Sequence, residues 1–279
     1  MALVNLNEVL LPAKKNKYAV GAFDFYSPWM MLGIMDAAEE LQVPVIMMVY
    51  DSPKFMNNLE VLAASVRAAA EKSSVPVVLH LDHGKNIEAC RRCVDAGFTS
   101  IMIDASGLPY QENVKITRDV AALCRPKGIS VEAELGQVGM GSNYNLENYQ
   151  YTDPQQAAEF VKATGVDALA VAIGNAHGVY KGEPVINYQV LQSLEKAVHV
   201  PLVLHGGSGI PDEDFFRMKN IGMTKFNFFT ELQMEATARL RATANDKLDV
   251  FNALETIRSA FKDKSAEKMK LLKKEKIKL

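Results

Sequence analysis

The sequence predicts an α/β fold in which eight parallel strands and their connecting helices close into a (β/α)8 TIM barrel. Apolar runs and helical patterns alternate in eight units over roughly 230 residues, as this barrel requires. Most of the runs are continuously apolar, as expected for parallel strands that are buried on both faces. Three histidines lie just past such runs and each is followed by a glycine, which indicates a polar site at one rim of the barrel.

The predicted elements follow one another in a regular strand–helix order. The strands cover residues 18–25, 44–49, 76–81, 100–104, 129–135, 168–173, 201–205 and 224–229. Helical patterns between them cover residues 29–40, 59–71, 86–96, 112–123, 154–164 and 188–197. A helix at residues 6–14 precedes the first strand, and helices at residues 231–245 and 249–272 follow the last one.

The whole chain is predicted to form one barrel domain, residues 1–279, with a C-terminal helical extension from about residue 246. A barrel of roughly 250 residues is a common single-domain size, so the length does not require a second domain. A doubly wound open sheet is the main alternative. Such a sheet brings histidines from the third, sixth and seventh strands together less readily than a barrel mouth does.

Composition and charge exclude several classes of function. The chain is 48% hydrophobic and 23% charged, which fits a soluble globular protein with a large core. It has 31 basic and 33 acidic residues, and no basic stripe with interleaved aromatic residues that would indicate nucleic-acid binding. No apolar run approaches the roughly 20 residues that span a membrane. The N-terminus lacks the features of a signal peptide, so we expect a cytoplasmic protein without membrane contact.

The three strand-end histidines are the strongest indication of chemistry. His83 ends the third strand, His177 lies in the loop after the sixth, and His205 ends the seventh. One such histidine alone would more often be a hydrogen-bonded structural residue. Together they lie at the rim where barrels of this fold build their active sites. Because three imidazoles with an open fourth position form a catalytic zinc site, the sequence predicts Zn²⁺ bound by these residues.

Carboxylates accompany the histidines. Asp82 precedes His83, and their side chains would point to opposite faces unless the strand ends and turns there. If it projects into the barrel mouth, Asp82 suits proton transfer to a substrate oxygen, and its alternative role is to orient a metal ligand. Glu132 and Glu134 alternate on the fifth strand and face the same way. Glu134, nearer the rim, is the functional candidate, and Glu132 is predicted to be a structural carboxylate.

A glycine-rich run follows the seventh strand. It contains Gly206, Gly207, Ser208 and Gly209, and Asn227 lies on the eighth strand. The loops after these two strands are the usual phosphate site of this fold, where glycines let backbone N–H groups approach an oxyanion and a serine hydroxyl donates. A metal, carboxylates and a phosphate site predict metal-dependent retro-aldol cleavage of a small sugar phosphate. In that reaction the metal polarises a ketone and stabilises an enediolate.

Five segments of the sequence are motifs of a known family. They are Leu81-Asp82-His83-Gly84, Met102-Ile103-Asp104-Ala105-Ser106, Val131-Glu132-Ala133-Glu134-Leu135-Gly136, Gly174-Asn175-Ala176-His177-Gly178 and Leu204-His205-Gly206-Gly207-Ser208-Gly209. From about residue 4 to residue 260 the chain resembles the class II, zinc-dependent aldolases that cleave fructose and tagatose bisphosphates. The resemblance implies an enzyme that reversibly cleaves a ketose 1-phosphate or 1,6-bisphosphate to dihydroxyacetone phosphate and an aldehyde.

The resemblance also implies roles for individual residues. His83, His177 and His205 would bind the catalytic zinc. Asp82 would be the acid and base at the aldehyde oxygen, and Glu134 would be able to hold the metal in an alternate position. The residues around the dihydroxyacetone phosphate moiety would be Gly178, Gly206, Ser208, Asn227 and Thr230. Such enzymes are often homodimers or homotetramers, and a monovalent cation, Na⁺ or K⁺, commonly lies near the phosphate.

The loop after the fifth strand departs from the family pattern. Family members usually carry acidic residues here, which supply the base for the C1 proton of dihydroxyacetone phosphate. In this chain Gly141, Ser142 and Asn143 replace them, and Glu147 is the only carboxylate in residues 139–147. We therefore predict Glu147 as the substitute catalytic base. The alternative is that the loop only closes over the site.

Residues expected near the far end of the substrate also differ. Bisphosphate aldolases often carry an arginine near the C-terminus, but residues 245–250 contain none. Tyr50 replaces a small Ser or Thr, and Asp24 replaces an Asn and either has a partner or reshapes acceptor recognition. Arginine typically binds a phosphate through two parallel hydrogen bonds. Because this arginine is missing, we hypothesise that the substrate is a ketose 1-phosphate whose aldehyde product is unphosphorylated, such as a longer sugar or sugar acid. Lys54 and Lys247 are candidates for a weaker phosphate contact.

Two other functions compete with this interpretation. A Schiff-base aldolase needs a lysine at the carboxyl end of a barrel strand, but Lys225 begins the eighth strand at the opposite end and no other strand lysine fits. The missing loop acids suggest a non-catalytic sugar-phosphate-binding protein derived from an aldolase. The three histidines and Asp82 argue against that alternative, because a binding protein does not need an open metal site with an adjacent acid.

Overall fold

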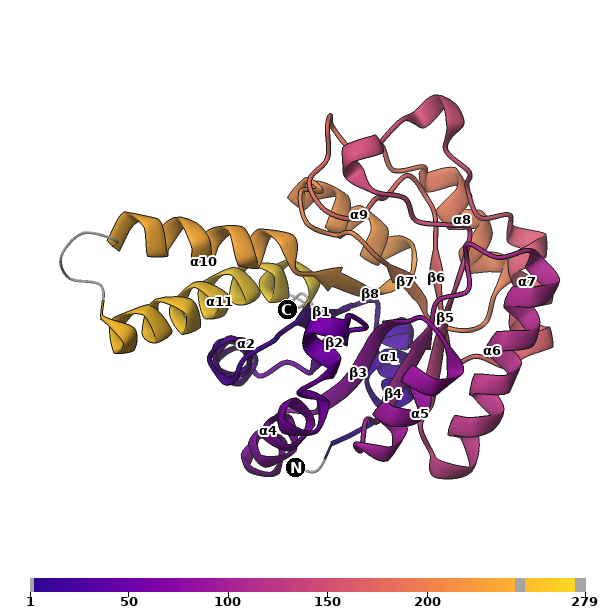
Figure 1. Ribbon diagram of the computed structural model, residues 1–279. Coiled ribbons are helices and arrows are strands. Elements are labelled where there is room, and N and C mark those ends of the chain that lie inside the picture. Colours follow the sequence, from indigo (N-terminus) through magenta and orange to yellow (C-terminus); the bar gives the residue numbers. More distant parts are fainter. Residues whose placement is uncertain (1–2, 244–248, 274–279) are drawn as a thin grey trace.

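Eight parallel strands pair in sequence order and close into a barrel in which β8 bonds to β1 (Figure 1). The strands are β1 (Val20–Asp24), β2 (Val45–Tyr50), β3 (Val77–Gly84), β4 (Ser100–Ile103), β5 (Ser130–Leu135), β6 (Ala168–Val171), β7 (Leu202–Leu204) and β8 (Met223–Phe228). This computed structural model describes residues 3–243 and 249–273. It confirms the predicted (β/α)8 TIM barrel and rules out the open doubly wound sheet.

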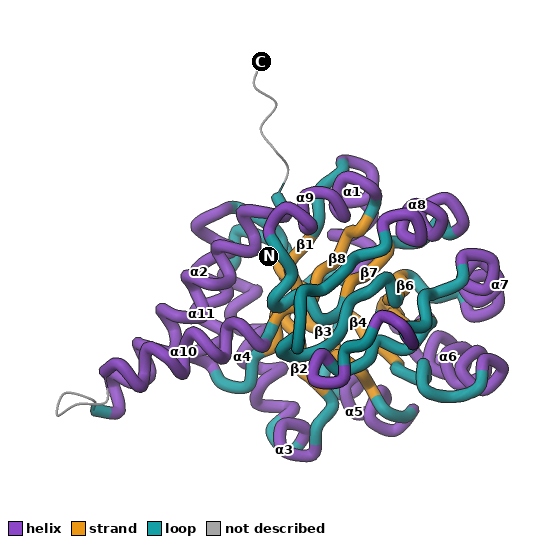
Figure 2. Tube along the Cα trace, turned by 90° about the horizontal axis from the view of Figure 1, so that it is seen from above, coloured by secondary structure: helices purple, strands orange, loops and turns teal. Residues whose placement is uncertain are grey.

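Helices surround the barrel, as the view from above shows (Figure 2). They are α1 (Leu6–Asn16), α2 (Pro28–Leu41), α3 (Pro53–Met56), α4 (Leu59–Lys72), α5 (Ile87–Asp95), α6 (Tyr110–Cys124), α7 (Pro154–Thr164), α8 (Tyr188–Ala197), α9 (Asp212–Ile221), α10 (Thr230–Thr243) and α11 (Val250–Leu272). Short 3₁₀ turns are η1 (Arg125–Lys127), η2 (Gly141–Asn143) and η3 (Leu146–Asn148). Helices α3 and α9 have no counterpart among the predicted elements. Helix α9 is short and polar in its first turn, and it is held to β8 by Phe215, whose ring packs on Phe226 and Phe228.

The end of β3 shows the largest difference between the predicted and observed strands. The prediction ends this strand at residue 81, where the apolar run stops, but β3 continues to Gly84. Its pairing with β4 shifts between Leu81 and Gly84, so the last residues form an irregular strand end. Hydrophobic patterning could not show this extension, because the added residues are polar or glycine.

Helix α1 covers the barrel interior, and it confirms the predicted N-terminal helix. Asn5 and Glu8 cap it reciprocally, each side chain accepting a hydrogen bond from the backbone N–H of the other. The apolar face of α1 and the interior of the barrel form one buried cluster. Its members include Leu6, Val9, Leu10, Ala13, Val20, Ala22, Ile46 and Val78. Apolar side chains therefore fill this part of the interior, and the cavity that the predicted site residues line lies toward the carboxyl ends of the strands.

Two helices follow β8, as predicted, and α11 lies against α2 on the outside of the barrel (Figure 1). Arg258 of α11 pairs with Asp36 of α2 through contacts of 2.7 and 3.1 Å. The two backbones approach closely at Gly33, where a Cβ would lie 2.3 Å from the carbonyl oxygen of Arg258. The predicted helix end at residue 245 and the candidate Lys247 fall outside the described residues.

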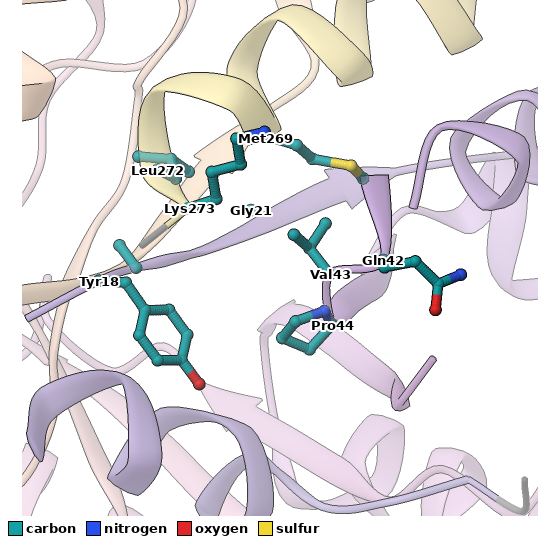
Figure 3. A pocket seen from close by; sticks show the side chains of 9 residues that line it. Tyr18, Gly21, Gln42, Val43, Pro44, Met269, Leu272 and Lys273 are labelled. Carbon is teal, nitrogen blue, oxygen red and sulfur yellow. The ribbon is translucent and has the colours of Figure 1, made fainter. Parts of the chain in front are cut away.

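A pocket of about 210 Å³ lies between β1 and α11 (Figure 3). Tyr18, Val43, Pro44, Met269 and Leu272 form much of its mainly apolar wall. Its described lining contains no histidine, cysteine or carboxylate, so it does not contain the predicted chemistry. Within residues 3–243 and 249–273, no helix is both long enough and apolar enough to cross a membrane.

We predict that Gly33→Ala destabilises the fold, although alanine favours a helix by about 1 kcal/mol over glycine. The added methyl group would lie 2.3 Å from the Arg258 carbonyl oxygen, so α2 and α11 would have to separate. Overpacking of this kind lowers the free energy of unfolding by about 1–3 kcal/mol, which urea denaturation would measure. Gly182→Ala is the control, because a Cβ there meets nothing within 4 Å. An unchanged free energy of unfolding in Gly33→Ala would contradict the close packing of the two helices.

Candidate active site

The carboxyl end of the barrel contains a cavity of about 510 Å³. Most of the predicted site residues line it. They are Asp24, Tyr50, Asp82, His83, Glu134, His177, Gly178, Gly206, Ser208, Asn227 and Thr230. Three predicted residues lie outside this lining: His205 and Gly207 are buried behind it, and Glu147 is exposed to solvent. Gly207 donates its backbone N–H to the carbonyl oxygen of Asn227.

One ring nitrogen of each histidine points to a common centre. His83 Nε2 lies 3.1 Å from His177 Nε2 and 2.8 Å from His205 Nδ1. The three ligand atoms all lie within 4.8 Å of one another. Three imidazole nitrogens that converge in this way are a ligand set for a metal cation such as zinc.

The other nitrogen of each ring is held by the protein. His83 Nδ1 lies 2.7 Å from Asp104 Oδ2, and His205 Nε2 lies 2.9 Å from Glu132 Oε1. The third histidine hydrogen bonds to the backbone of the loop after β5. Partners of this kind orient imidazole ligands and raise their basicity. No role was predicted for Asp104, although a carboxylate directly after β4 is a sequence feature that could have indicated a residue of the site.

The three rings differ in their affinity for a proton. Burial disfavours a charge on His83, but Asp82 and Asp104 outweigh this effect and raise the pKa of His83 to about 10. Burial, together with the charge on His83, lowers the pKa of His177 to about 4 and that of His205 well below its usual value. The surroundings therefore favour one positive charge beside two neutral rings. A metal cation bound at the centre would replace the proton on His83.

The backbone at the end of β3 explains how Asp82 and His83 both reach the cavity. His83 has a φ of 49°, in the left-handed region that residues other than glycine rarely adopt. The pairing with β4 shifts at the same point, between Leu81 and Gly84. This turn removes the alternation of side chains that a regular strand imposes. Such a conformation costs on the order of 1–3 kcal/mol and is typical of functional sites.

Asp82 borders the cavity and is only 4% exposed. Its Oδ1 accepts a hydrogen bond of 3.0 Å from Asn227 Nδ2, so Asn227 orients the carboxyl group. Burial raises the pKa of Asp82 above its usual value, although the charge on His83 acts in the opposite direction. A carboxyl group with a raised pKa is a stronger base toward a substrate hydroxyl.

Three buried oxygens at the cavity have no hydrogen-bond partner among the described residues. They are Asp24 Oδ1, Glu134 Oε2 and Asn227 Oδ1. Buried polar atoms are rarely left unsatisfied, so these oxygens are places for donors or a cation that a ligand supplies. Glu134 Oε2 lies 3.7 Å from His205 Nδ1, which suits a second ligand position for a metal. Burial, reinforced by Asp104, raises the pKa of Glu134 to about 8.

The loops after β7 and β8 form an end of the cavity that is rich in backbone groups. Gly206 has a φ of 68°, and a Cβ there would lie 2.0 Å from the carbonyl oxygen of Ala176, so only glycine fits. Ser208 Oγ accepts a hydrogen bond from Glu231 N–H in the first turn of α10. Thr230 begins α10 and lines the cavity. Because the amino end of a helix attracts anions, these groups can hold a phosphate.

Lys85 lies at the opposite side of the cavity and was not singled out from the sequence. Its Nζ lies 5.7 Å from the centroid of the Tyr50 ring. Its backbone N–H donates to Asp51 Oδ2 over 2.8 Å, which fixes the chain after β3. Lys85 is the only lysine or arginine in the described lining, and Lys54 does not take part in it. Its position two residues after His83 is the sequence feature that could have indicated a cavity residue.

The loop after β5 is joined to the loop after β6. Met140 forms a parallel bridge with His177, and backbone hydrogen bonds of 2.7 and 2.8 Å connect the two loops there. The hydroxyl groups of Tyr144 and Tyr149 donate to backbone carbonyl oxygens of the second loop over 2.8 and 2.9 Å. The part of this loop near Met140 therefore forms a wall of the cavity.

Glu147 lies farther along the same loop, in η3, and its side chain is exposed. The structure does not bring it into the cavity, because the 3₁₀ turns and the tyrosine contacts direct the chain away from the histidines. Its role as the base for the C1 proton stays a prediction without geometric support.

Tyr180 connects the histidine end of the cavity to the phosphate end, and the sequence contains no pattern that marks it. Its hydroxyl oxygen accepts from Ala176 N–H over 2.8 Å and donates to the carbonyl oxygen of Gly206 over 3.0 Å. Its ring also meets Tyr144 edge to face, with centroids 5.2 Å apart. Tyr180 thereby holds the chain next to His177 against the glycine-rich run.

We predict that Tyr180→Phe lowers the free energy of unfolding by about 1–3 kcal/mol, because it leaves a backbone N–H and a backbone carbonyl without their partner. Urea denaturation of the purified protein measures this change. Tyr151→Phe is the matched control, since Tyr151 is 36% exposed and its hydroxyl has water available. Equal losses in the two variants would show that the Tyr180 hydroxyl does not stabilise these loops.

Comparison with known proteins shows similarity to aldolases over nearly the whole chain. A family model described as fructose-bisphosphate aldolase class-II matches residues 4–276. The chain is 40% identical over 277 residues to the probable fructose-bisphosphate aldolase of Bacillus subtilis (strain 168), with 97% of both chains covered. It is 42% identical over 246 residues to the fructose-bisphosphate aldolase of Geobacillus stearothermophilus, covering 86% of this chain and 85% of that one. The crystal structure of the YdjI aldolase from Escherichia coli K12 matches with a TM-score of 0.88 and 38% identity over 98% of both chains. The chain therefore belongs to the class-II fructose-bisphosphate aldolase family.

Proposed function

We propose that this protein catalyses the zinc-dependent, reversible aldol cleavage of a ketose phosphate to dihydroxyacetone phosphate and an aldehyde. The observation that carries the proposal is the convergence of three imidazole nitrogens, within 4.8 Å of one another, beside the buried Asp82 carboxyl group. Membership of the class-II aldolase family supports it. The reaction needs a cation at the carbonyl and a proton acceptor at the cleaved hydroxyl, and the three histidines and Asp82 would supply these two requirements side by side.

The residues present fit a zinc ion. His83, His177 and His205 would hold it as three nitrogen ligands, and the unpartnered Oε2 of Glu134 would serve as a ligand in an alternate position. A three-histidine set with an open position is typical of catalytic zinc. When bound, the ion would supply Lewis-acid polarisation of the ketose carbonyl.

Asp82 would handle the proton of the alcohol that becomes the aldehyde. Asn227 holds its Oδ1, so the second carboxylate oxygen is left for the substrate hydroxyl. Burial raises the pKa of Asp82 and strengthens it as a base in the cleavage direction. In the synthesis direction the same group returns the proton to the aldehyde oxygen.

The phosphate of the dihydroxyacetone phosphate half would bind between the glycine-rich run and α10. The groups proposed for it are Gly178, Gly206, Ser208, Asn227 and Thr230. Gly207 is not among them, because it lies outside the cavity lining and its N–H already donates to the carbonyl oxygen of Asn227. A Na⁺ or K⁺ ion near this phosphate, a homodimeric or homotetrameric assembly and a cytoplasmic location stay predictions from the family resemblance. For Glu147 to act as the base at C1, its loop would have to leave the hydrogen bonds that hold it.

The other end of the cavity favours an aldehyde without a phosphate. Its described lining has no arginine, and its one lysine, Lys85, is paired with the ring of Tyr50. Asp24 presents a buried oxygen without a partner, which suits a substrate hydroxyl better than a second phosphate. Burial, with Asp82 nearby, raises the pKa of Asp24 well above its usual value. We therefore propose a ketose 1-phosphate substrate, with Asp24 and Tyr50 contacting the sugar chain.

A panel of ketose 1-phosphates and 1,6-bisphosphates tests this function through the release of dihydroxyacetone phosphate. We expect cleavage of a ketose 1-phosphate that stops when a chelator removes the metal and returns when Zn²⁺ is added. We expect treatment with borohydride in the presence of substrate to leave the activity unchanged, because Lys225 lies buried within β8 and outside the cavity lining. Tenfold or greater preference for ketose 1-phosphates is expected, which corresponds to roughly 1.4 kcal/mol between the two transition states.

Each competing function gives a different result in this panel. Clear preference for fructose 1,6-bisphosphate would overturn the proposed substrate and leave the aldolase activity in place. Activity that survives the chelator but is lost to borohydride would indicate a Schiff-base enzyme. No cleavage, together with no exchange of the C1 hydrogen of dihydroxyacetone phosphate in the presence of zinc, would indicate a sugar-phosphate-binding protein.

We predict that Asp82→Asn lowers kcat for cleavage by about 10²–10⁴-fold, since a positioned acid–base group contributes an effect of this size. Zinc-dependent exchange of the C1 hydrogen of dihydroxyacetone phosphate should change far less, because that step does not involve the aldehyde oxygen. Asp95→Asn, at an exposed position of α5, is the control and should retain both activities. Equal loss of cleavage and exchange in Asp82→Asn would remove Asp82 from the proposed role.

A further inference from the structure

A second polar cluster lies inside the barrel, behind the histidines. It consists of Glu132 from β5, Lys225 from β8 and His80 from β3, and their side chains are fully buried. Lys225 Nζ lies 3.1 Å from Glu132 Oε1 and 2.9 Å from Glu132 Oε2. It also lies 3.5 Å from His80 Nε2. The proposed reaction uses none of these three groups.

Glu132 connects this cluster to the histidines. Its Oε1 lies 2.9 Å from His205 Nε2, while His205 Nδ1 faces His83 Nε2 at 2.8 Å. The carboxylate therefore selects the tautomer of His205 that has its proton on Nε2, and this leaves the lone pair of Nδ1 for a metal. The position of the Glu132 carboxylate decides both the tautomer and the angle of the ring.

Glu132 needs a counter-charge to remain in this position. A fully buried carboxylate without one is strongly disfavoured, and it would turn toward any water or donor within reach. Among the described side chains, Lys225 is the one ammonium or guanidinium group that pairs with it. The Lys225 ammonium hydrogen bonds to Glu132 Oε1 and to His80 Nε2, and it lies within ion-pair distance of Glu132 Oε2, although the geometry there does not complete a hydrogen bond. The second nitrogen of His80 is held by Ser100 Oγ at 2.7 Å, which fixes the ring beside Lys225.

We infer that Lys225 is a positioning residue for the zinc site: it holds the Glu132 carboxylate, which sets the tautomer and orientation of His205. This inference rests on the metal site proposed above. Lys225 does not line the cavity, so it acts through Glu132 and without touching the substrate. The same contacts exclude a Schiff-base role, because the nitrogen that would have to react is enclosed by its three partners.

The zinc affinity of the folded apoprotein tests this role without measuring activity. We expect Lys225→Met to bind Zn²⁺ about 10–100-fold more weakly in competition with a chromophoric chelator, which is the usual effect of losing a group that orients a metal ligand. The absorption spectrum of the Co²⁺-loaded protein should also shift. Lys219→Met is the matched control, because Lys219 is a buried lysine of α9 whose ammonium donates to the carbonyl oxygens of Leu271 and Lys273. It should lose stability and keep both the zinc affinity and the Co²⁺ spectrum.

The possible results separate the inference from the proposed function. Wild-type zinc affinity in Lys225→Met, or an equal loss in Lys219→Met, would overturn the inference. If circular dichroism shows that Lys225→Met does not fold, Lys225→Gln replaces it, since its amide is polar but does not carry the charge that holds the Glu132 carboxylate. A tenfold or greater loss of zinc affinity is expected there, and wild-type affinity would again refute the inference. A wild-type protein that binds no zinc would instead refute the metal site, and the inference with it.

Discussion

The barrel mouth gathers more acidic side chains than its own cationic side chains can pair, and the geometry of the site depends on this excess. Its carboxylates are Asp24, Asp82, Asp104, Glu132 and Glu134, and four of them are buried. Lys225 forms its ion pair with Glu132, while Asp82 and Asp104 act on His83. The raised pKa of His83 is the consequence. A divalent cation among the three rings would satisfy these acidic groups better than a proton can, because it would also use the lone pairs of the two neutral imidazoles.

The two ends of the cavity differ in the kind of group that lines them: backbone groups dominate at one end and side chains at the other. The end at β7 and β8 consists largely of backbone groups, glycines and the start of α10, and such groups suit a phosphate whatever sugar is attached to it. The end at β1, β2 and β3 consists of the side chains of Asp24, Tyr50 and Lys85. Side chains change easily without disturbing the barrel, so under the proposed function the part of the cavity for the aldehyde half of the substrate is where family members can diverge.

The loop after β5 shows how a local sequence change alters the possible chemistry. The residues that replace the expected acids lie in a segment that contacts the loop after β6. Met140 and the hydroxyls of Tyr144 and Tyr149 make these contacts. These contacts stabilise the position of His177 from the outside, as Asp104 and Glu132 stabilise the other two rings from below. The same contacts keep Glu147 at the surface. In this chain the loop therefore supports a histidine of the site and does not bring an acid into the cavity.

Much of the fold and of the site was determined by the sequence alone. In a closed barrel of parallel strands, neighbours in sequence are neighbours in space and every carboxyl end lies at one rim, so apolar runs that end in His83, His177 and His205 already place three imidazoles together. The tertiary structure alone decided how individual side chains pair across the barrel. The left-handed turn at His83, the Lys225–Glu132 pair and the contact of Lys85 with Tyr50 all depend on strand register and on backbone angles at strand ends. Hydrophobic periodicity encodes which face of an element is buried, and it contains no information about the partner that a long polar side chain meets on another strand.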